Sequence, residues 1–233
     1  MPYTKRYQTA APVLANYDWA DVAAGTGIIT YYGASMLDNT TETFILTRNS
    51  SVQSNYVATG SMTEGLPSLD KDFDLTFTEQ KRIKGRVKVG ITLGIYCNSS
   101  TSTNAGTLYA TVHMERVRAG TPTALGDFQT QTLTITDGQL SQLDTYSKQM
   151  AGEIDIATSQ TFQKDDILRF TIKIYMDTTN NRLLGGFAHS PHGDKDSATE
   201  NNIAISSGIA IKLIQDADNT QLTFQIPYLL GLR

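Results

Sequence analysis

Residues 167–176 read Ile-Leu-Arg-Phe-Thr-Ile-Lys-Ile-Tyr-Met, and this stretch decides the fold class. Every even position from Leu168 to Met176 is apolar, whereas Arg169, other polar residues and Tyr175 stand between them. Alternation with a period of two predicts a strand with one buried face and one solvated face. The β-branched and aromatic content also favours a strand over a helix. We therefore expect a central strand of an antiparallel sandwich.

The same alternation recurs along the chain and predicts about ten strands. The longest pattern covers residues 83–97, and Lys84, Arg86 and Lys88 project from its outer face. Together with residues 107–117 it is expected to form a long hairpin. Shorter strands are expected at residues 28–33, 42–47, 56–59, 73–77, 132–136, 146–156, 203–214 and 221–228.

The spacing of these strands predicts an all-β fold in which two antiparallel sheets pack as a sandwich. A jelly roll is the preferred topology, with a barrel or an immunoglobulin-like sandwich as alternatives. We expect an irregular, aromatic N-terminal arm at residues 1–27 and a single domain at residues 28–233. The arm lies either over its own domain or against a neighbouring subunit.

Several breaks in the pattern predict irregular segments. Residues 119–126, which contain Pro122, are expected to form a loop, and residues 139–144 one helical turn. Residues 177–202 form the largest gap and predict a long loop that is functional or mobile. Pro227 indicates that the last strand lies at an edge or is close to its end.

Composition narrows the class of protein. The chain has 233 residues and a net charge of −4. This mild acidic balance provides no basic field that would attract nucleic acid or an anionic membrane surface. Its single cysteine, Cys97, continues an alternating strand and is expected to be a small core residue. The first residues lack the apolar segment of a signal peptide, and no apolar run reaches membrane-spanning length.

Candidate chemistry is sparse. His189, His192, Asp194 and Asp196 are the one concentration of possible metal ligands, and they fit a metal site, an interface loop or a solvated loop. Asp216, Asp218 and Asn219 resemble part of a calcium loop but lack its glycine and glutamate, so a hairpin turn is favoured. Nucleophile-elbow, phosphate-loop and zinc-protease motifs are absent. We therefore expect no enzymatic activity, no cofactor and no metal.

A basic stripe formed by Lys81, Arg82, Lys84, Arg86 and Lys88 has two interpretations. It is either the solvated outer face of an edge strand or a contact with an acidic neighbouring subunit. An interface is expected mainly at the arm and the 177–202 loop. Its candidate residues are Tyr3, Tyr7, Tyr17, Trp19, Arg86, Leu183, Leu184, Phe187, His189 and His192.

Three features carry a resemblance to a known class of protein. They are the aromatic arm, the entry into the opening strand at residues 161–169 (Thr-Phe-Gln-Lys-Asp-Asp-Ile-Leu-Arg), and the last strand at residues 224–228 (Phe-Gln-Ile-Pro-Tyr). They resemble jelly-roll proteins of virus particles, such as capsid decoration, cement and minor capsid proteins of tailed phages and related viruses. The 161–169 entry also resembles strands of trimeric tumour-necrosis-factor-like jelly rolls.

The resemblance implies a structural role in the virion, which is assembled in the host cytoplasm. It implies a homo-oligomer, expected as a trimer, that binds the capsid surface through the major capsid protein or another virion protein. The alternative is a carbohydrate- or receptor-binding sandwich of a tail fibre or spike, with tyrosine and tryptophan side chains as the stacking platform.

Overall fold

The computed structural model describes residues 15–16, 26–38, 41–49, 57–60, 67, 69–97, 105–140, 145–178, 183–189, 202–204, 210–212 and 222–229. Every regular element in these ranges is a β-strand, so the fold is all-β as expected, and the strands form a β-sandwich. No helix long and apolar enough to cross a membrane occurs among these residues.

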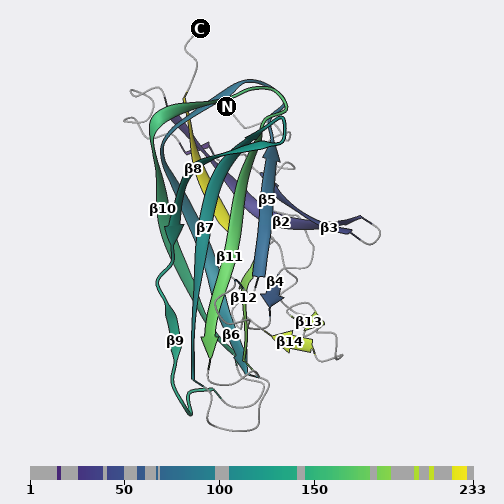
Figure 1. Ribbon diagram of the computed structural model, residues 1–233, viewed down its shortest axis with the longest axis vertical. Coiled ribbons are helices and arrows are strands. Elements are labelled where there is room, and N and C mark those ends of the chain that lie inside the picture. The colour runs from purple at the N-terminus through teal and green to yellow at the C-terminus, as the bar shows by residue number, and fades with distance from the viewer. Residues whose placement is uncertain are drawn as a thin grey trace, which may run out of the picture.

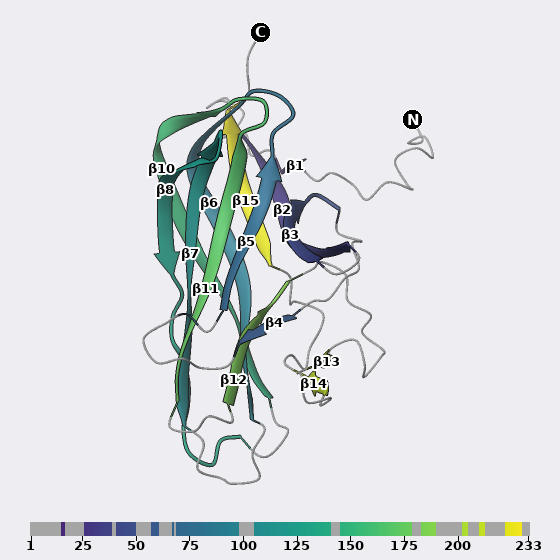
Figure 2. The same cartoon turned by 45° about the vertical axis from the view of Figure 1, so that its right-hand side comes forward.

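Two layers form the sandwich, and Figures 1 and 2 show them one behind the other. We call them the front layer and the back layer. The front layer contains β5 (Leu69–Thr76), β11 (Ile167–Thr178), β7 (Gly106–Arg118), β8 (Thr121–Gln129) and the short β9 (Leu133–Ile135). The back layer contains β4 (Val57–Gly60), β12 (Leu183–Ala188), β6 (Lys81–Cys97), β10 (Thr145–Phe162), β15 (Thr223–Leu229) and β2 (Thr26–Asp38).

One strand joins the layers into a continuous sheet. β3 (Thr41–Thr47) pairs antiparallel with β2 and meets β5 through a single parallel pair, Ile45 with Asp74. All other pairings among the described strands are antiparallel. β1 (Ala15–Asn16) pairs with β2, while β13 (Asn202–Ala204) and β14 (Ala210–Lys212) form a separate pair. The rest of the expected arm, residues 1–14 and 17–25, lies outside the described residues.

The core lies between the layers and follows the predicted alternation. In β11, Leu168, Phe170, Ile172 and Ile174 are fully buried and Met176 is 7% exposed. Phe170 meets Phe224 of the back layer with ring centroids 4.4 Å apart. The odd-numbered apolar residues of β6 are buried as well, including Cys97, which is confirmed as a core residue.

Close approach of the layers explains one glycine. A Cβ at Gly152 of β10 would collide with the ring of Phe128, which lies on β8 in the other layer. Any larger residue at position 152 would push the edge strand β8 away from β10.

The expected hairpin between residues 83–97 and 107–117 is wrong. β6 pairs with β10, β12 and β15 in the back layer, whereas β7 pairs with β11, β8 and β9 in the front layer. Alternation specifies which side of a strand is buried but carries no information about its neighbour in the sheet. The two strands therefore lie in different layers and are not neighbours in the sheet.

The expected loop at residues 119–126 is also wrong, because β8 begins at Thr121. Ala119 and Gly120 have φ angles of 48° and 78°, and Arg118 pairs directly with Thr121. Positive φ at both central residues is the geometry of a type I′ hairpin turn. Pro122 is tolerated because β8 lies at the end of the sheet.

The segment 177–202 is not one long loop. β11 continues to Thr178, and β12 occupies Leu183–Ala188 between β4 and β6. The sequence pattern does not predict β12, because Gly185 and Gly186 interrupt its apolar alternation. Of the turn expected at 139–144, Gln139 and Leu140 form a bend, and residues 141–144 lie outside the described part.

Pro227 does not mark an edge strand. β15 pairs with β2 on one side and β6 on the other, so it is an interior strand that ends two residues later, at Leu229. The ladder with β6 is interrupted between Gln225 and Tyr228, beside Gly85, whose φ is 111°. This irregularity accommodates a residue that has no N–H to donate.

Candidate functional site

The outer face of the front layer carries a network of charged side chains centred on Arg169. In the sheet, Arg169 of β11 lies directly between Asp74 of β5 and Glu115 of β7. Its Nε and an Nη donate to the two carboxylate oxygens of Asp74 at 2.7 and 2.8 Å, and Asp72 lies 3.1 Å away. Hydrogen bonding to Asp74 and the attraction of the nearby carboxylates raise the pKa of Arg169, so it stays charged.

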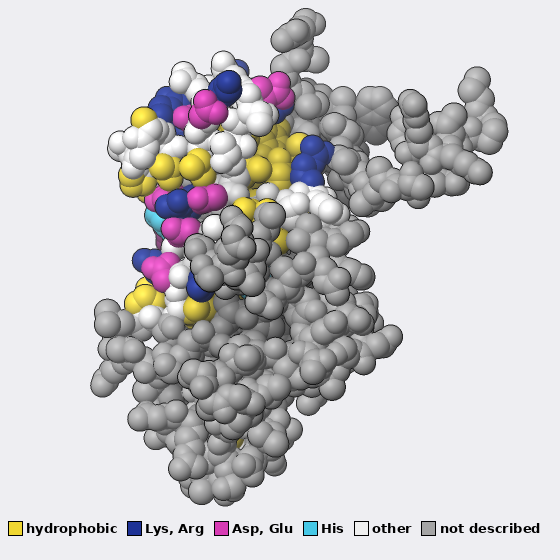
Figure 3. Space-filling model, turned by 90° about the vertical axis from the view of Figure 1, so that its right-hand side faces the viewer, with side chains coloured by type: hydrophobic (Ala, Val, Ile, Leu, Met, Phe, Trp, Pro, Cys, Tyr) yellow, Lys and Arg dark blue, Asp and Glu magenta, His cyan; other side chains and the backbone are white. Residues whose placement is uncertain are grey.

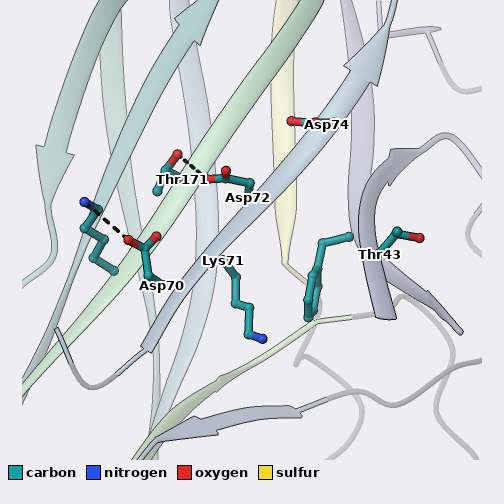
Figure 4. Close-up of a pocket in the computed structure, with 8 residues that line it drawn as sticks. Thr43, Asp70, Lys71, Asp72, Asp74 and Thr171 are labelled. Carbon is teal, nitrogen blue, oxygen red and sulfur yellow. Dashed lines mark hydrogen bonds and ion pairs between the residues drawn. The ribbon is translucent and has the colours of Figure 1, made fainter. Parts of the chain in front are cut away.

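Two further rows extend this network along β5 and β11. The hydroxyl of Thr171 donates to Asp72 at 2.6 Å, and Lys173 lies 3.4 Å from Asp70. Figure 4 shows Asp70 and Asp72 turned toward β11, whereas Lys71 extends to the other side of β5. Lys71 lies over the ring of Phe44, 4.7 Å from its centroid. We call this array of cross-linked side chains the charged lattice.

A shallow hollow of about 590 Å³ opens beside the charged lattice. Its wall combines carboxylates, ammonium groups, hydroxyls and one aromatic ring: Thr43, Phe44, Asp70, Lys71, Asp72, Asp74, Thr171 and Lys173. In Figure 3, acidic and basic side chains alternate down this edge of the molecule. Such a wall offers hydrogen bonds, charge and one aromatic ring.

Aromatic and histidine side chains continue the same face. Tyr109 of β7 and Tyr175 of β11 stack with centroids 5.0 Å apart and planes 13° from parallel. His113 lies 3.9 Å from Glu115. Among the described residues, no group of three or more histidine, cysteine or acidic side chains is arranged to hold a metal ion.

The basic stripe lies on the outer face of the back layer. Arg82, Lys84, Arg86 and Lys88 are all exposed there. The interpretation as an edge strand is wrong, because β6 lies between β10 and β15. Arg86 pairs with Glu153 of β10 at 3.4 Å and Arg82 hydrogen-bonds to Ser159 at 3.3 Å, while Lys81 pairs with Glu79.

A second hollow, of about 560 Å³, lies where β2 and β3 meet β5 and β15. It is more apolar, with Tyr31, Leu46, Phe77 and Tyr228 in its wall. The hydroxyl of Tyr228 donates to that of Tyr31 at 3.1 Å, and burial raises the pKa of Tyr228. Figure 3 shows hydrophobic side chains at the surface beside the charged edge. Arg48, Glu79 and Lys81 also line this hollow.

A third charged cluster closes the turn that leads into β11. Arg118 donates from Nε and Nη2 to the two oxygens of Asp166, the shortest bond being 2.6 Å, and the same Nη2 also donates to the carbonyl of Thr161 at 3.1 Å. Asp166 also accepts from the backbone N–H of Gln163 at 2.7 Å. These bonds lower the pKa of the buried Asp166 carboxyl, the bond to Arg118 contributing most.

The residues predicted for an interface have four different outcomes. Arg86 is exposed on the back layer, as described above. Leu183 and Phe187 are fully buried and His189 is 1% exposed, so the expectation that they lie on an exposed loop is wrong. Leu184 belongs to β12. Tyr3, Tyr7, Tyr17, Trp19 and His192 lie outside the described residues, as do Asp194, Asp196 and the 216–219 turn.

His189 belongs to an aromatic cluster in the core. Its ring lies 5.4 Å from that of Phe44 and 6.0 Å from those of Phe73 and Phe187, measured between centroids. Burial lowers the pKa of His189 to about 3, and Lys71 contributes in the same direction. The imidazole is therefore neutral at physiological pH.

Comparison of the sequence with family models and with curated proteins finds no match. Solved structures do match. A CocE/NonD family hydrolase from Staphylococcus aureus is 12% identical with a TM-score of 0.44, over 86% of this chain and 37% of the hydrolase. An alpha-amino acid ester hydrolase is 11% identical with a TM-score of 0.33, over 79% of this chain and 33% of its own.

A viral capsid protein also matches. The VP2 subviral particle of infectious bursal disease virus is 13% identical with a TM-score of 0.27, over 84% of this chain and 44% of VP2. The chain thus spans less than half the length of each of these proteins. At such identities and scores, the likeness assigns neither an activity nor a partner to this chain.

One expectation is corrected by these comparisons. The sequence analysis expected no enzymatic activity, but the solved structures that match this chain include hydrolases. The statement that the chain is not an enzyme is therefore withdrawn.

Proposed function

We propose that this chain is a structural subunit of a virus particle, and that it binds other virion proteins through the outer faces of its sandwich. In its finer form, the proposal is a decoration or minor capsid protein that acts as a homo-oligomer, with a trimer as the first candidate. The sequence resemblance to virion jelly rolls supports this proposal.

The charged lattice is the structural observation that carries the proposal. Arg169, Thr171 and Lys173 are each held by a partner on β5 at 2.6 to 3.4 Å. These groups are therefore ordered before any partner arrives, which lowers the entropic cost of association. A broad sheet face with ordered charges is suited to recognise a protein surface of complementary charge.

Fractionation of particles tests this proposal. Particles from the source culture would be separated on a density gradient and probed with an antibody raised against the full chain. We expect the chain in the fractions that contain the capsid, and expect it to leave them only when the particles are dissociated. Its presence solely among soluble proteins would contradict the proposal.

A second function, carbohydrate binding, is favoured by the hollow beside the charged lattice. Carboxylates, a hydroxyl and the half-buried ring of Phe44 occur together there, and carbohydrates bind through hydrogen bonds and stacking on aromatic rings. A glycan array would test it, with Thr171→Val as the variant and Thr123→Val, on an exposed part of β8, as the control. Reproducible binding lost only in Thr171→Val supports this function, and absence of binding to any glycan argues against it.

A further inference from the structure

The two outer faces of the sandwich carry opposite charge. On the front layer, carboxylates outnumber the two cations, Arg169 and Lys173, among the residues described. These carboxylates project from β5, β7, β8 and β11, and they are Asp70, Asp72, Asp74, Glu115, Asp127 and Asp177.

On the outer face of the back layer the balance is reversed. The described part of this face has four cations, Arg82, Lys84, Arg86 and Lys88, and two carboxylates, Glu153 and Asp155. Arg86 is paired with Glu153, whereas Lys84 and Lys88 have no ion pair with any described residue. The basic face therefore retains two charges, Lys84 and Lys88, that none of the described residues neutralises through an ion pair.

The cations of β6 and the carboxylates of β5 have the same spacing along their strands. The cations stand at alternate positions of β6, and Asp70, Asp72 and Asp74 stand at alternate positions of β5. Alternate residues of a strand point the same way and are about 7 Å apart. Two such rows, one cationic and one anionic, match in spacing when the sheets that carry them face each other with aligned strands.

We propose that the basic outer face of the back layer docks on the acidic outer face of the front layer of a second copy of this chain. The inference rests on the proposed role as an assembly subunit and names the partner of that surface. Because the two faces differ, the contact is head-to-tail, and such contacts either close into a ring or continue as an open array. Charge complementarity of this kind steers association and weakens with salt.

A charge-swap experiment tests the docking. The back-face variant is Lys84→Glu with Lys88→Glu, and the front-face variant is Asp70→Lys with Asp72→Lys. The matched control is Lys148→Glu with Lys164→Glu, which makes the same charge change as the back-face variant at exposed positions outside both faces. Sedimentation velocity of the full chain measures association, and thermal melting confirms that each variant is folded.

We expect the native chain to self-associate, with affinity falling about tenfold or more between about 0.05 and 0.5 M NaCl. Each charge-reversed variant alone should be monomeric, their mixture should associate, and the control should behave as the native chain does. A monomeric native chain, a mixture that stays monomeric, or a control as impaired as the variants would overturn the docking. Particle fractionation is independent of these results, so a chain that is found in particles but fails the swap refutes the docking alone.

Discussion

The outer faces of the two layers place an arginine in different surroundings. Arg169 on the front layer lies between two carboxylates in register, and its side chain is 28% exposed. Among the described residues, Arg86 on the back layer has one ion pair, at 3.4 Å, and its side chain is 70% exposed. Both arginines occupy the polar positions of long alternating strands. The residues on the neighbouring strands therefore decide whether an arginine becomes part of an ordered lattice or stays exposed with one weak ion pair.

The comparison of faces depends on the layers staying packed, and Phe170→Ala should disrupt that packing most. The substitution removes a fully buried ring that lies 4.4 Å from Phe224 of the other layer. We expect a loss of about 3–5 kcal/mol in the free energy of unfolding, measured by urea denaturation. Phe128→Ala, at a half-buried edge position, should cost less. Equal losses would mean that the centre of the sandwich is no more tightly packed than its edge.

The free energy of unfolding should depend on pH through His189, which packs against Phe44 of β3. Its pKa is about 3 in the folded chain and about 6.5 when unfolded, so the unfolded chain binds the proton between these values. This contribution to stability is complete above pH 6.5 and is lost as the pH falls, by at most about 4 kcal/mol at pH 3.

His189→Phe should remove this dependence, because a phenyl ring in the same aromatic cluster does not titrate. The measurement is the midpoint of denaturant unfolding at intervals from pH 7 to pH 3, for the native chain and the variant. Parallel curves for the two proteins would show that His189 does not titrate as its burial implies.

The turn between β10 and β11 should be weakened by Asp166→Asn. The substitution replaces the charged acceptor of Arg118 and of the Gln163 N–H, and we expect a loss of about 2 kcal/mol. Because the pKa of Asp166 is lowered on folding, its contribution is present above the unfolded pKa of about 4 and is lost as the pH falls further. Asp165→Asn is the matched control, since asparagine tolerates the φ of 68° at that exposed position. Comparable melting temperatures for the two variants would contradict the role given to Asp166.

The smallest effect sharpens the comparison of the faces directly. Arg169→Met should cost about 1 kcal/mol, because it leaves Asp72 and Asp74, which point to the same side of β5, without their shared cation. Arg86→Met should change stability by less than about 0.5 kcal/mol, as is usual for an exposed pair. Thermal melting at low salt distinguishes the two variants, and an equal loss of stability would contradict the distinction between the lattice arginine and the exposed one.

Sequence reasoning identified the strands better than their partners. Alternation correctly predicted the buried side of β6 and β11, because every second residue of these strands is apolar or small. Alternation does not predict β12, where Gly185 packs against Leu108 and Met176. It also does not predict β8, because a two-residue turn separates β8 from β7 where the sequence suggests a longer loop. The charged lattice could not be predicted from the sequence, since Arg169 and Asp74 are 95 positions apart and come together only through strand pairing.

The place of β15 has a consequence for how the chain folds. This strand lies between β2 and β6, yet more than a hundred residues separate it from either in sequence. During synthesis β2 and β6 exist long before the strand that bridges them, and their edges stay open until it arrives. Closing such distant pairs makes folding slow and exposes unpaired edges to other chains. Co-translational folding should therefore leave the back layer unfinished until residues 223–229 have emerged.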